Sequence, residues 1–417
     1  MRISTRTIYD SATNQMNSLQ TALNKTQLQL SSGDKMLNAS DDPIAAARAL
    51  QVTQSQSINT QLSTNRSNAT STLSVEETGL SSAITIISGI QTSVVQAGNG
   101  SLTDSDRADL ATQIEGAMND LLGVANQQDG SGNYLFSGYK TATVPFVLTA
   151  TGATYQGDQG QPTLQVGATR SIPTSDSGSS VFANGMTGNG TFATTAGAAN
   201  YTNGGSGIIS PGTVSDQSKL TGDNYTISFA VTAADATTNT AASTTYTVLD
   251  NTTGLPVPDA TPIPYTSGST IEFDGQQMAI TGVPANGDTF SVAPSTKTSL
   301  FTTLQTLLTT LRSPSTGVAG NAALSNGLNA ASSELSSAYD NVISVRSAVG
   351  SRLKEVDSLN SSGDDLTVNY ATTLSGLQDL DQVAAISLFT QQQTTLTAAQ
   401  KSFTAISGLS LFNYISG

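Results

Sequence analysis

Apolar side chains recur every three or four residues at both ends of the chain, and this spacing predicts long helices. The first series lies between residues 9 and 30, and the second runs from Pro43 to Ala97 without another proline. Shorter or later series cover 110–124, 324–359 and the last fifty residues. Because a sustained 3.5-residue period turns one face of a helix toward a partner helix, the pattern predicts coiled-coil pairing.

A helix from Pro43 to Ala97 would be about 80 Å long at ~1.5 Å per residue, too long for one compact globule. Any single stripe is also typical of a core helix in a bundle. Five stripes confined to both ends favour two arms that pair into a rod. The positions expected to pack in the rod are Leu73, Leu80, Ile87, Val94, Leu335, Val342, Val345, Val349 and Leu353, with Glu76 and Arg352 as polar interruptions.

The outermost helices carry a second set of apolar positions, which are expected to serve assembly. They are Tyr9, Met16, Leu19, Leu23, Leu30, Leu374, Leu377, Leu388, Phe403 and Phe412. After Leu377 the predicted seam continues through Ala384, Leu388, Ala398, Ala405, Leu409 and Phe412, which leaves Ile386, Phe389 and Phe403 off it.

Proline separates these arms from the middle of the chain. Ten of the twelve prolines lie between Pro145 and Pro294, where long helices are therefore excluded. Short β-rich runs fill this region, and Asp274-Gly275 between two of them predicts a hairpin turn. We expect an all-β insert of one or two lobes, with the Gly- and Ala-rich stretch 177–212 as its loosest part.

The sequence thus predicts a multi-domain α + β protein: a long α-helical coiled-coil rod made of N- and C-terminal segments, with a central all-β insert. Terminal helical segments are expected at 1–40 and 364–417. A rod domain with a β-hairpin is expected at 41–140 and 297–363, and the insert at 141–296.

The stretch SSGDKMLNASDDP (31–43) is predicted to be a joint between two helices. Gly33 can end the first helix, and Asp42 can cap the second with Pro43 in its first position. Asp41 would complement the positive end of the helix dipole. The pair Asp364–Asp365 is expected to cap another helix in the same way.

Composition removes most kinds of chemistry. The chain has no Cys and no His, which excludes Ser-His-Asp and Cys-His nucleophiles and zinc sites built on these residues. A net charge of −14 argues against a nucleic-acid partner. The loop DGSGNYLFSGYK (129–140) begins like a calcium loop but lacks the glycine at its sixth position and the acid at its twelfth. It is interpreted as a turn into a hairpin that carries Tyr134, Leu135 and Phe136.

We therefore expect no catalytic residue, no metal site, no cofactor and no enzymatic activity. The start of the chain lacks the apolar region of a cleaved signal peptide. No window approaches the ~18 apolar residues that a membrane span needs, so membrane insertion is not expected.

The two ends together resemble the flagellin family. LSSGDKMLNASDDPIAAARAL (30–50) is similar to the segment that joins the terminal helix to the rod helix in that family. VRSAVGSRL (345–353) resembles its counterpart on the returning helix, and residues 374–415 resemble the C-terminal assembly helix. The start MRIST and the run GNYLFSGYKTATVPF (132–146) are similar to the family members that join hook and filament.

The resemblance implies a structural component of the bacterial flagellum, outside the cell, exported through the type III apparatus without a cleaved signal. It also implies terminal segments that are disordered in the free monomer and fold on assembly into an inner layer. The implied partners are other copies of the chain in a ring, hook-associated protein 1, flagellin and an export chaperone. Two alternatives stay open: a flagellin-like filament subunit, and a junction protein whose β insert also binds glycans or adheres to surfaces.

Overall fold

The computed structural model describes residues 5–234 and 241–408. Its long helices are those that the apolar spacing predicts, and the second begins at Pro43 and ends at Ala97 as expected. The helices are α1 (Thr5–Ser32), α2 (Pro43–Ala97), α3 (Asp104–Ala125), α4 (Gly178–Phe182), α5 (Asn200–Asn203), α6 (Leu300–Arg312), α7 (Gly317–Gln378) and α8 (Gln382–Gly408), with the 3₁₀ helix η1 (Gln217–Lys219).

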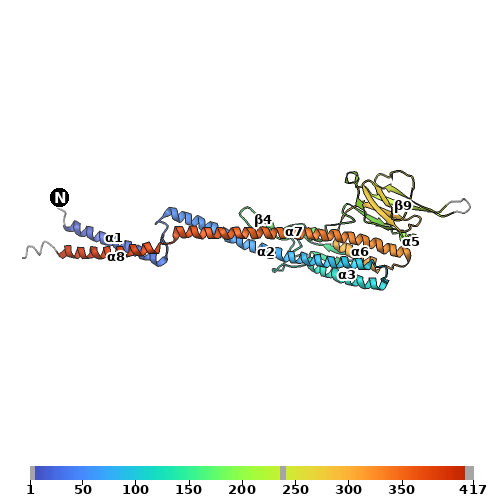
Figure 1. Cartoon of the computed structure of the whole chain (residues 1–417). Coiled ribbons are helices and arrows are strands. Elements are labelled where there is room, and N and C mark those ends of the chain that lie inside the picture. The colour runs from blue at the N-terminus through green and yellow to red at the C-terminus, as the bar shows by residue number, and fades with distance from the viewer. Residues whose placement is uncertain (1–4, 235–240, 409–417) are drawn as a thin grey trace, which may run out of the picture. The chain divides into compact units, whose positions relative to one another are not determined.

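The strands fall between α3 and α6, which confirms the predicted fold class of helical arms around a β-rich middle (Figure 1). They are β1 (Phe146–Thr149), β2 (Gly152–Tyr155), β3 (Thr163–Gln165), β4 (Ser171–Pro173), β5 (Gly185–Met186), β6 (Phe192–Ala196), β7 (Ile208–Ile209), β8 (Thr213–Val214), β9 (Tyr225–Thr232), β10 (Ser243–Asp250), β11 (Pro256–Val257), β12 (Ile263–Pro264), β13 (Thr270–Phe273), β14 (Gln276–Thr281), β15 (Thr289–Pro294) and β16 (Lys297–Thr298).

The chain divides into two compact units, which we describe separately. The terminal unit comprises residues up to Asn65 and from Ser358 onward, and the central unit comprises Arg66–Asp357. In the terminal unit α1 and α8 lie side by side (Figure 1). The ring of Tyr9 meets that of Phe403 edge-on, with centroids 5.1 Å apart.

The helical part of the central unit is built on the predicted apolar seam. Leu73, Leu80 and Ile87 of α2 are fully buried, and so are Leu335 and Val342 of α7. One finding differs from the sequence prediction: α2 is long and apolar enough to cross a membrane, with a window of mean hydropathy 1.2. Since the seam positions of this helix are buried inside the protein, we interpret α2 as a core helix.

The β-rich part has one main core. The longest sheet has the order β11-β10-β9-β15-β6, with β12 also paired to β10, and β13-β14-β7 form a second sheet in which β8 pairs with β14. Their inward side chains, among them Tyr225, Ile227 and Phe290, form one buried cluster. The predicted turn at Asp274-Gly275 is confirmed: both residues have positive φ (43° and 75°), and Phe273 pairs with Gln276 across it.

The beginning of the expected insert packs differently, because residues 141–186 join the helical core. The rings of Phe146 and Phe182 both lie against Phe301 of α6, with centroids 5.1 and 6.2 Å apart. The main β core therefore lies within residues 192–292. The predicted hairpin at 134–136 is wrong: Tyr134 forms an isolated bridge with Gln128, and the first hairpin is β1–β2.

The Gly- and Ala-rich stretch 177–212 was expected to be the loosest part of the insert, and the structure contradicts this. It contains α4, β5, β6, α5 and β7, and it contributes Phe182, Phe192 and Ile209 as buried side chains. The small residues allow close approach of other elements. A Cβ on Gly188, for example, would overlap with the carbonyl oxygen of Phe192.

Candidate assembly surface

The joint between α1 and α2 begins at a glycine, as its sequence predicts. Gly33 has φ of +80°, a conformation that glycine adopts without strain, and its N–H donates to the carbonyl of Gln29 at 2.9 Å. This closes the last turn of α1. The chain then turns through residues 34–42 and enters α2.

Two adjacent aspartates form different hydrogen bonds at the start of α2. The Asp42 carboxylate accepts from the backbone N–H of Ala45 at 3.0 Å and caps the helix, with Pro43 as its first residue. Asp41, for which a role at the positive end of the helix dipole was expected, makes a different set of contacts. Its Oδ2 accepts from the N–H groups of Leu37 (3.1 Å) and Asn38 (3.2 Å), and its Oδ1 binds the Lys25 ammonium at 2.7 Å.

Asp41 therefore fixes the turn itself and ties it to α1. The hydrogen bond from Lys25, supported by the Asn38 backbone, holds the pKa of the Asp41 carboxyl below its usual range. The ion pair is partly exposed, so it contributes little to stability.

The returning chain bends at the same place. The N–H of Lys35 donates to the carbonyl of Gln378 at 2.7 Å, and that of Leu380 donates to Gly33 at 2.9 Å. Asp381 then caps α8 by accepting from the N–H of Ala384 at 3.0 Å. The two breaks in the helices are thus hydrogen-bonded to each other and form one double joint.

The expected cap at Asp364–Asp365 is wrong, because α7 continues through both residues to Gln378. Two adjacent acids before an apolar pattern suggested a helix start, but a continuous helix tolerates them on an exposed face. The break at 379–381 carries the similar signal Asp-Leu-Asp, which could have been used to find it.

The pairing face of α8 differs by one helical position from the prediction. Ala385 and Leu396 are buried and Phe389 and Phe403 are half-buried, whereas the predicted Ala384, Leu388, Ala398 and Ala405 are exposed. The predicted register assumed that the heptad series of α7 runs on into α8. The break at 379–381 resets it.

The other assembly positions lie at the interface only in part. Met16, Leu19, Leu23, Leu30, Leu374 and Leu377 are half-buried, and Tyr9 remains 40% exposed despite its ring contact with Phe403. Leu409 and Phe412 lie outside the described residues. Apolar side chains away from the α1–α8 contact are strongly exposed, among them Val383 (81%) and Ile386 (51%). The terminal helices thus present a second, uncovered apolar face.

The rod positions are mostly buried. Leu73, Leu80, Ile87, Val94, Leu335, Val342 and Val349 are buried, whereas Val345 and Leu353 are only half-buried. Arg346, next to Val345, reaches out to Glu77 with an N–O distance of 2.6 Å. This part of α7 lies at the border of the core.

A buried polar cluster interrupts the rod seam where Glu76 replaces an apolar residue. Glu76 Oε1 accepts from the backbone N–H of Asp176 at 2.9 Å, and the Asp176 carboxylate pairs with both Nη atoms of Arg352 at 2.8 and 3.1 Å. Burial, and next the charge of Asp176, raise the pKa of Glu76 to about 8. The sequence showed Glu76 and Arg352 as interruptions, but it held no signal that Asp176 lies between them.

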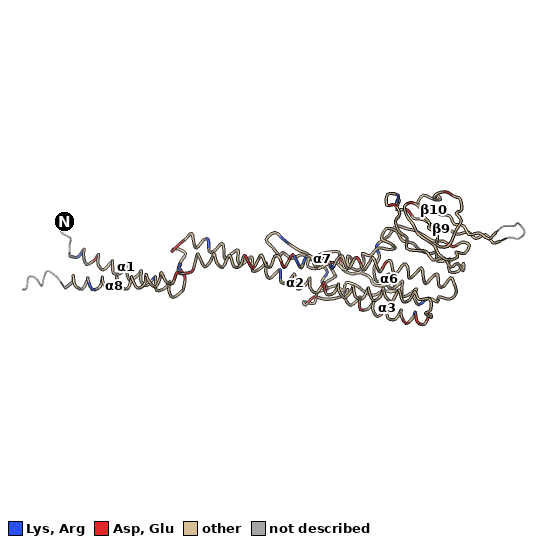
Figure 2. The backbone as a smooth tube through the Cα atoms, in the orientation of Figure 1, with Lys and Arg blue, Asp and Glu red and all other residues tan. Residues whose placement is uncertain are grey.

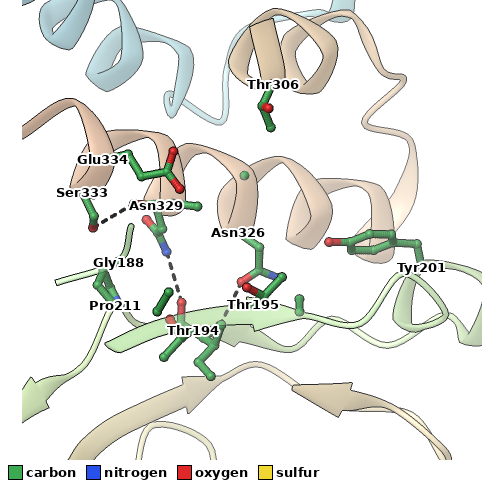
Figure 3. Close-up of a pocket in the computed structure, with 15 residues that line it drawn as sticks. Gly188, Thr194, Thr195, Tyr201, Pro211, Thr306, Asn326, Asn329, Ser333 and Glu334 are labelled. Carbon is green, nitrogen blue, oxygen red and sulfur yellow. Dashed lines mark hydrogen bonds between the residues drawn. The ribbon is translucent and has the colours of Figure 1, made fainter. Parts of the chain in front are cut away.

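A cavity of about 200 Å³ lies between α7 and β6–β7 in the central unit (Figure 3). Several of its polar side chains are hydrogen-bonded within the protein. Asn326 binds the backbone of Ile209 and Gly207 at 2.9 and 3.0 Å, and Glu334 accepts from the Thr303 hydroxyl at 2.6 Å. These bonds fix β7 and α6 to α7, so the lining serves packing.

Charged groups are sparse along the tube (Figure 2). Within residues 5–234 and 241–408, no three Asp or Glu side chains gather closely enough to hold a metal ion. Asp129 of the calcium-like loop instead accepts from the N–H groups of Ser131 and Asn133 at 2.8 and 2.9 Å and closes a turn.

Comparison with known proteins agrees with this architecture. Residues 3–141 match the bacterial flagellin N-terminal helical region. Flagellar hook-associated protein 3 of Salmonella typhimurium is 30% identical over 416 residues, covering 99% of each chain. This chain belongs to the flagellar hook-associated protein 3 family. The Escherichia coli member is 29% identical, again over 99% of each chain.

Solved structures of the same family share the fold. The crystal structure of flagellar hook-associated protein 3 from Legionella pneumophila has a TM-score of 0.71 at 31% identity, covering 78% of this chain and 98% of that one. A structure of the flagellar junction protein FlgL from the same organism gives 0.69 at 30% identity, covering 80% of this chain and 100% of that one.

The prediction of a structural protein of the flagellar hook–filament junction is thus confirmed, and the filament-subunit alternative is not favoured. As a member of this family, the chain is a component of the flagellum, an appendage outside the cell, and associates with other flagellar components.

Proposed function

We propose that this chain forms a closed layer between hook-associated protein 1 and the flagellin filament, through its terminal helices. Residues 1–40 and 364–417 would form an inner layer, 41–140 and 297–363 a rod, and the β-rich middle an outer surface. The observation that carries the proposal is the uncovered apolar surface of α8, where Val383 and Ile386 are 81% and 51% exposed. Apolar surface left free in one copy indicates packing against another.

The same argument indicates the partners. The apolar surface of α8 would pack against neighbouring copies in a ring, and the two rims of that ring would meet hook-associated protein 1 and flagellin. Before assembly, an export chaperone would cover the terminal segments, and the type III apparatus would export the chain without a cleaved signal. No enzymatic activity, nucleic-acid binding or membrane insertion belongs to this role.

Deletion of the last forty residues tests the proposal. We expect cells with the truncated chain to build hooks without filaments and to lose motility, while the β-rich middle still folds. A truncated chain that supports filament growth would contradict the proposal.

Point variants test the face itself. Val383→Gln together with Ile386→Gln should abolish ring formation, because two amides would replace the apolar contact. Gln391→Ala together with Gln393→Ala, at exposed polar positions of α8, is the matched control and should assemble normally. Equal assembly of both double variants would exclude this face as the interface.

The junction role and a filament role differ in how far assembly proceeds. A purified junction protein added to hook-associated protein 1 seeds should stop after a limited layer. Continuous growth of filaments from the purified chain alone would favour the filament role.

A further inference from the structure

In the terminal unit, α2 faces α7 with mostly polar side chains. Ser55, Gln56 and Ser63 are half-buried on this face, and Asn59 is buried with only 7% of its surface exposed. A buried polar residue in a helix seam needs a partner, because an unpaired amide loses its hydrogen bonds to water.

Asn59 finds its partners on α7. Its Nδ2 donates to the backbone carbonyl of Gly363 at 2.7 Å and to the hydroxyl of Thr367 at 2.9 Å. The Gly363 carbonyl also accepts from the Thr367 hydroxyl at 2.9 Å, so the three groups form a closed network. Glycine is suited to this position because no side chain shields its carbonyl from a neighbouring helix.

The network matters because long helices with a heptad repeat can pair in more than one register. A slip of one heptad would place Val356 opposite Asn59 in one direction and Tyr370 in the other. Val356 would cover its own carbonyl with a branched side chain, and the Tyr370 ring would occupy the place of the amide. Apolar seam positions would tolerate either slip far better, since one aliphatic side chain can replace another.

We propose that Asn59 is a register-determining residue, which together with the backbone bonds of the double joint favours the pairing of α2 and α7 in which its amide meets Gly363 and Thr367. A buried polar residue at the contact between paired helices is a known means of fixing their register. The proposal concerns pairing within one chain and does not depend on the partners assigned to the junction.

The absence of cysteine makes the register measurable by introduced disulfides in the full chain. Leu62 lies three residues after Asn59, Leu359 lies four residues before Gly363, and both are half-buried. Leu62→Cys with Leu359→Cys therefore reports the register of the structure. Leu62→Cys with Leu366→Cys, seven residues further on α7, is the matched reporter of a one-heptad slip.

With Asn59 present, mild oxidation should cross-link only the first pair. Asn59→Leu should raise cross-linking of the second pair at least about fivefold, without lowering the thermal midpoint, because leucine suits a seam and specifies no register. A residue that served packing alone would lower the midpoint and leave the cross-links unchanged. Thr367→Val, which keeps the Gly363 carbonyl, should give a smaller increase.

Three results would overturn the proposal. The first is cross-linking of the Leu62–Leu359 pair alone in Asn59→Leu. The second is equal cross-linking of both pairs in the parent chain. The third is no cross-linking of either pair, which would mean that the helices are not paired there. If Asn59→Leu fails to fold, the Thr367→Val result decides.

Discussion

The two units use the same heptad spacing with different outcomes. In the central unit the seam positions Leu73 and Leu80 are fully buried, whereas in the terminal unit Leu19 and Leu23 stay half-buried. These central seam positions are buried within one chain. The terminal unit leaves apolar side chains of α8 exposed, so under the proposed function the same pattern serves folding in one unit and assembly in the other.

The largest expected effect is a difference between the two units in how much free energy of unfolding a Leu→Ala change removes. Leu80→Ala should lower the free energy of unfolding of the central unit by about 3 kcal/mol, because it leaves a cavity in a closed core. Leu23→Ala is the matched control in the terminal unit, where a half-buried side chain should cost less than about 1 kcal/mol in the free chain. Urea unfolding of both variants measures the difference, and equal losses would contradict the comparison.

The second prediction concerns pH in the central unit. Glu76 has a folded pKa of about 8 and an ordinary value of 4.5, so the folded state holds its proton more tightly than the unfolded state. Its contribution to stability is therefore fully present below about pH 4.5 and is lost as pH rises through about 8. At pH 9 Glu76 of the parent chain carries a buried charge, so Glu76→Gln, which stays neutral, should make the central unit more stable than the parent chain there.

Thermal unfolding between pH 5 and 9 checks this. The parent chain should lose stability across that range more steeply than Glu76→Gln does, and the curves should converge at the acid end. Glu77→Gln, at the next residue and in a partly exposed ion pair, is the control. Parallel curves for the parent chain and Glu76→Gln would show that Glu76 is charged in the folded protein.

The third prediction returns to the joint. Asp42→Ala removes the cap of α2 and should cost about 1 kcal/mol in the terminal unit, with little effect on the central unit. Asp42→Asn keeps a capping oxygen and should recover most of the loss. Hydrogen exchange of the Ala45 amide gives a direct measurement, and unchanged protection in Asp42→Ala would exclude the cap.

How much of this could be predicted from sequence depends on whether the signal is local. The period fixed by Leu73, Leu80 and Ile87, the proline at 43 and the Asp274-Gly275 turn are local, and the corresponding elements are present as predicted. The cluster of Glu76 with Asp176 and the hydrogen bond between Asn59 and Gly363 join residues 100 and 304 positions apart, and no local pattern marks them. The predicted pairing face of α8 was wrong for a related reason: the break before α8 interrupts the heptad series of α7.

The smallest expected effect is at the Lys25–Asp41 ion pair. Here the effect on thermal stability can be measured separately from the effect on the turn. Both groups are partly exposed, so salt screens the pair, and Lys25→Ala should shift the thermal midpoint by only about 1 °C or less. The turn is also held by Leu37 and Asn38, so Lys25→Gln should keep it intact. Replacing Asp41 by Ala removes all three bonds and should loosen the turn, which amide exchange at Leu37 and Asn38 would show. Equal exchange in the Lys25 and Asp41 variants would mean that the ion pair, rather than the backbone bonds of Asp41, fixes the joint.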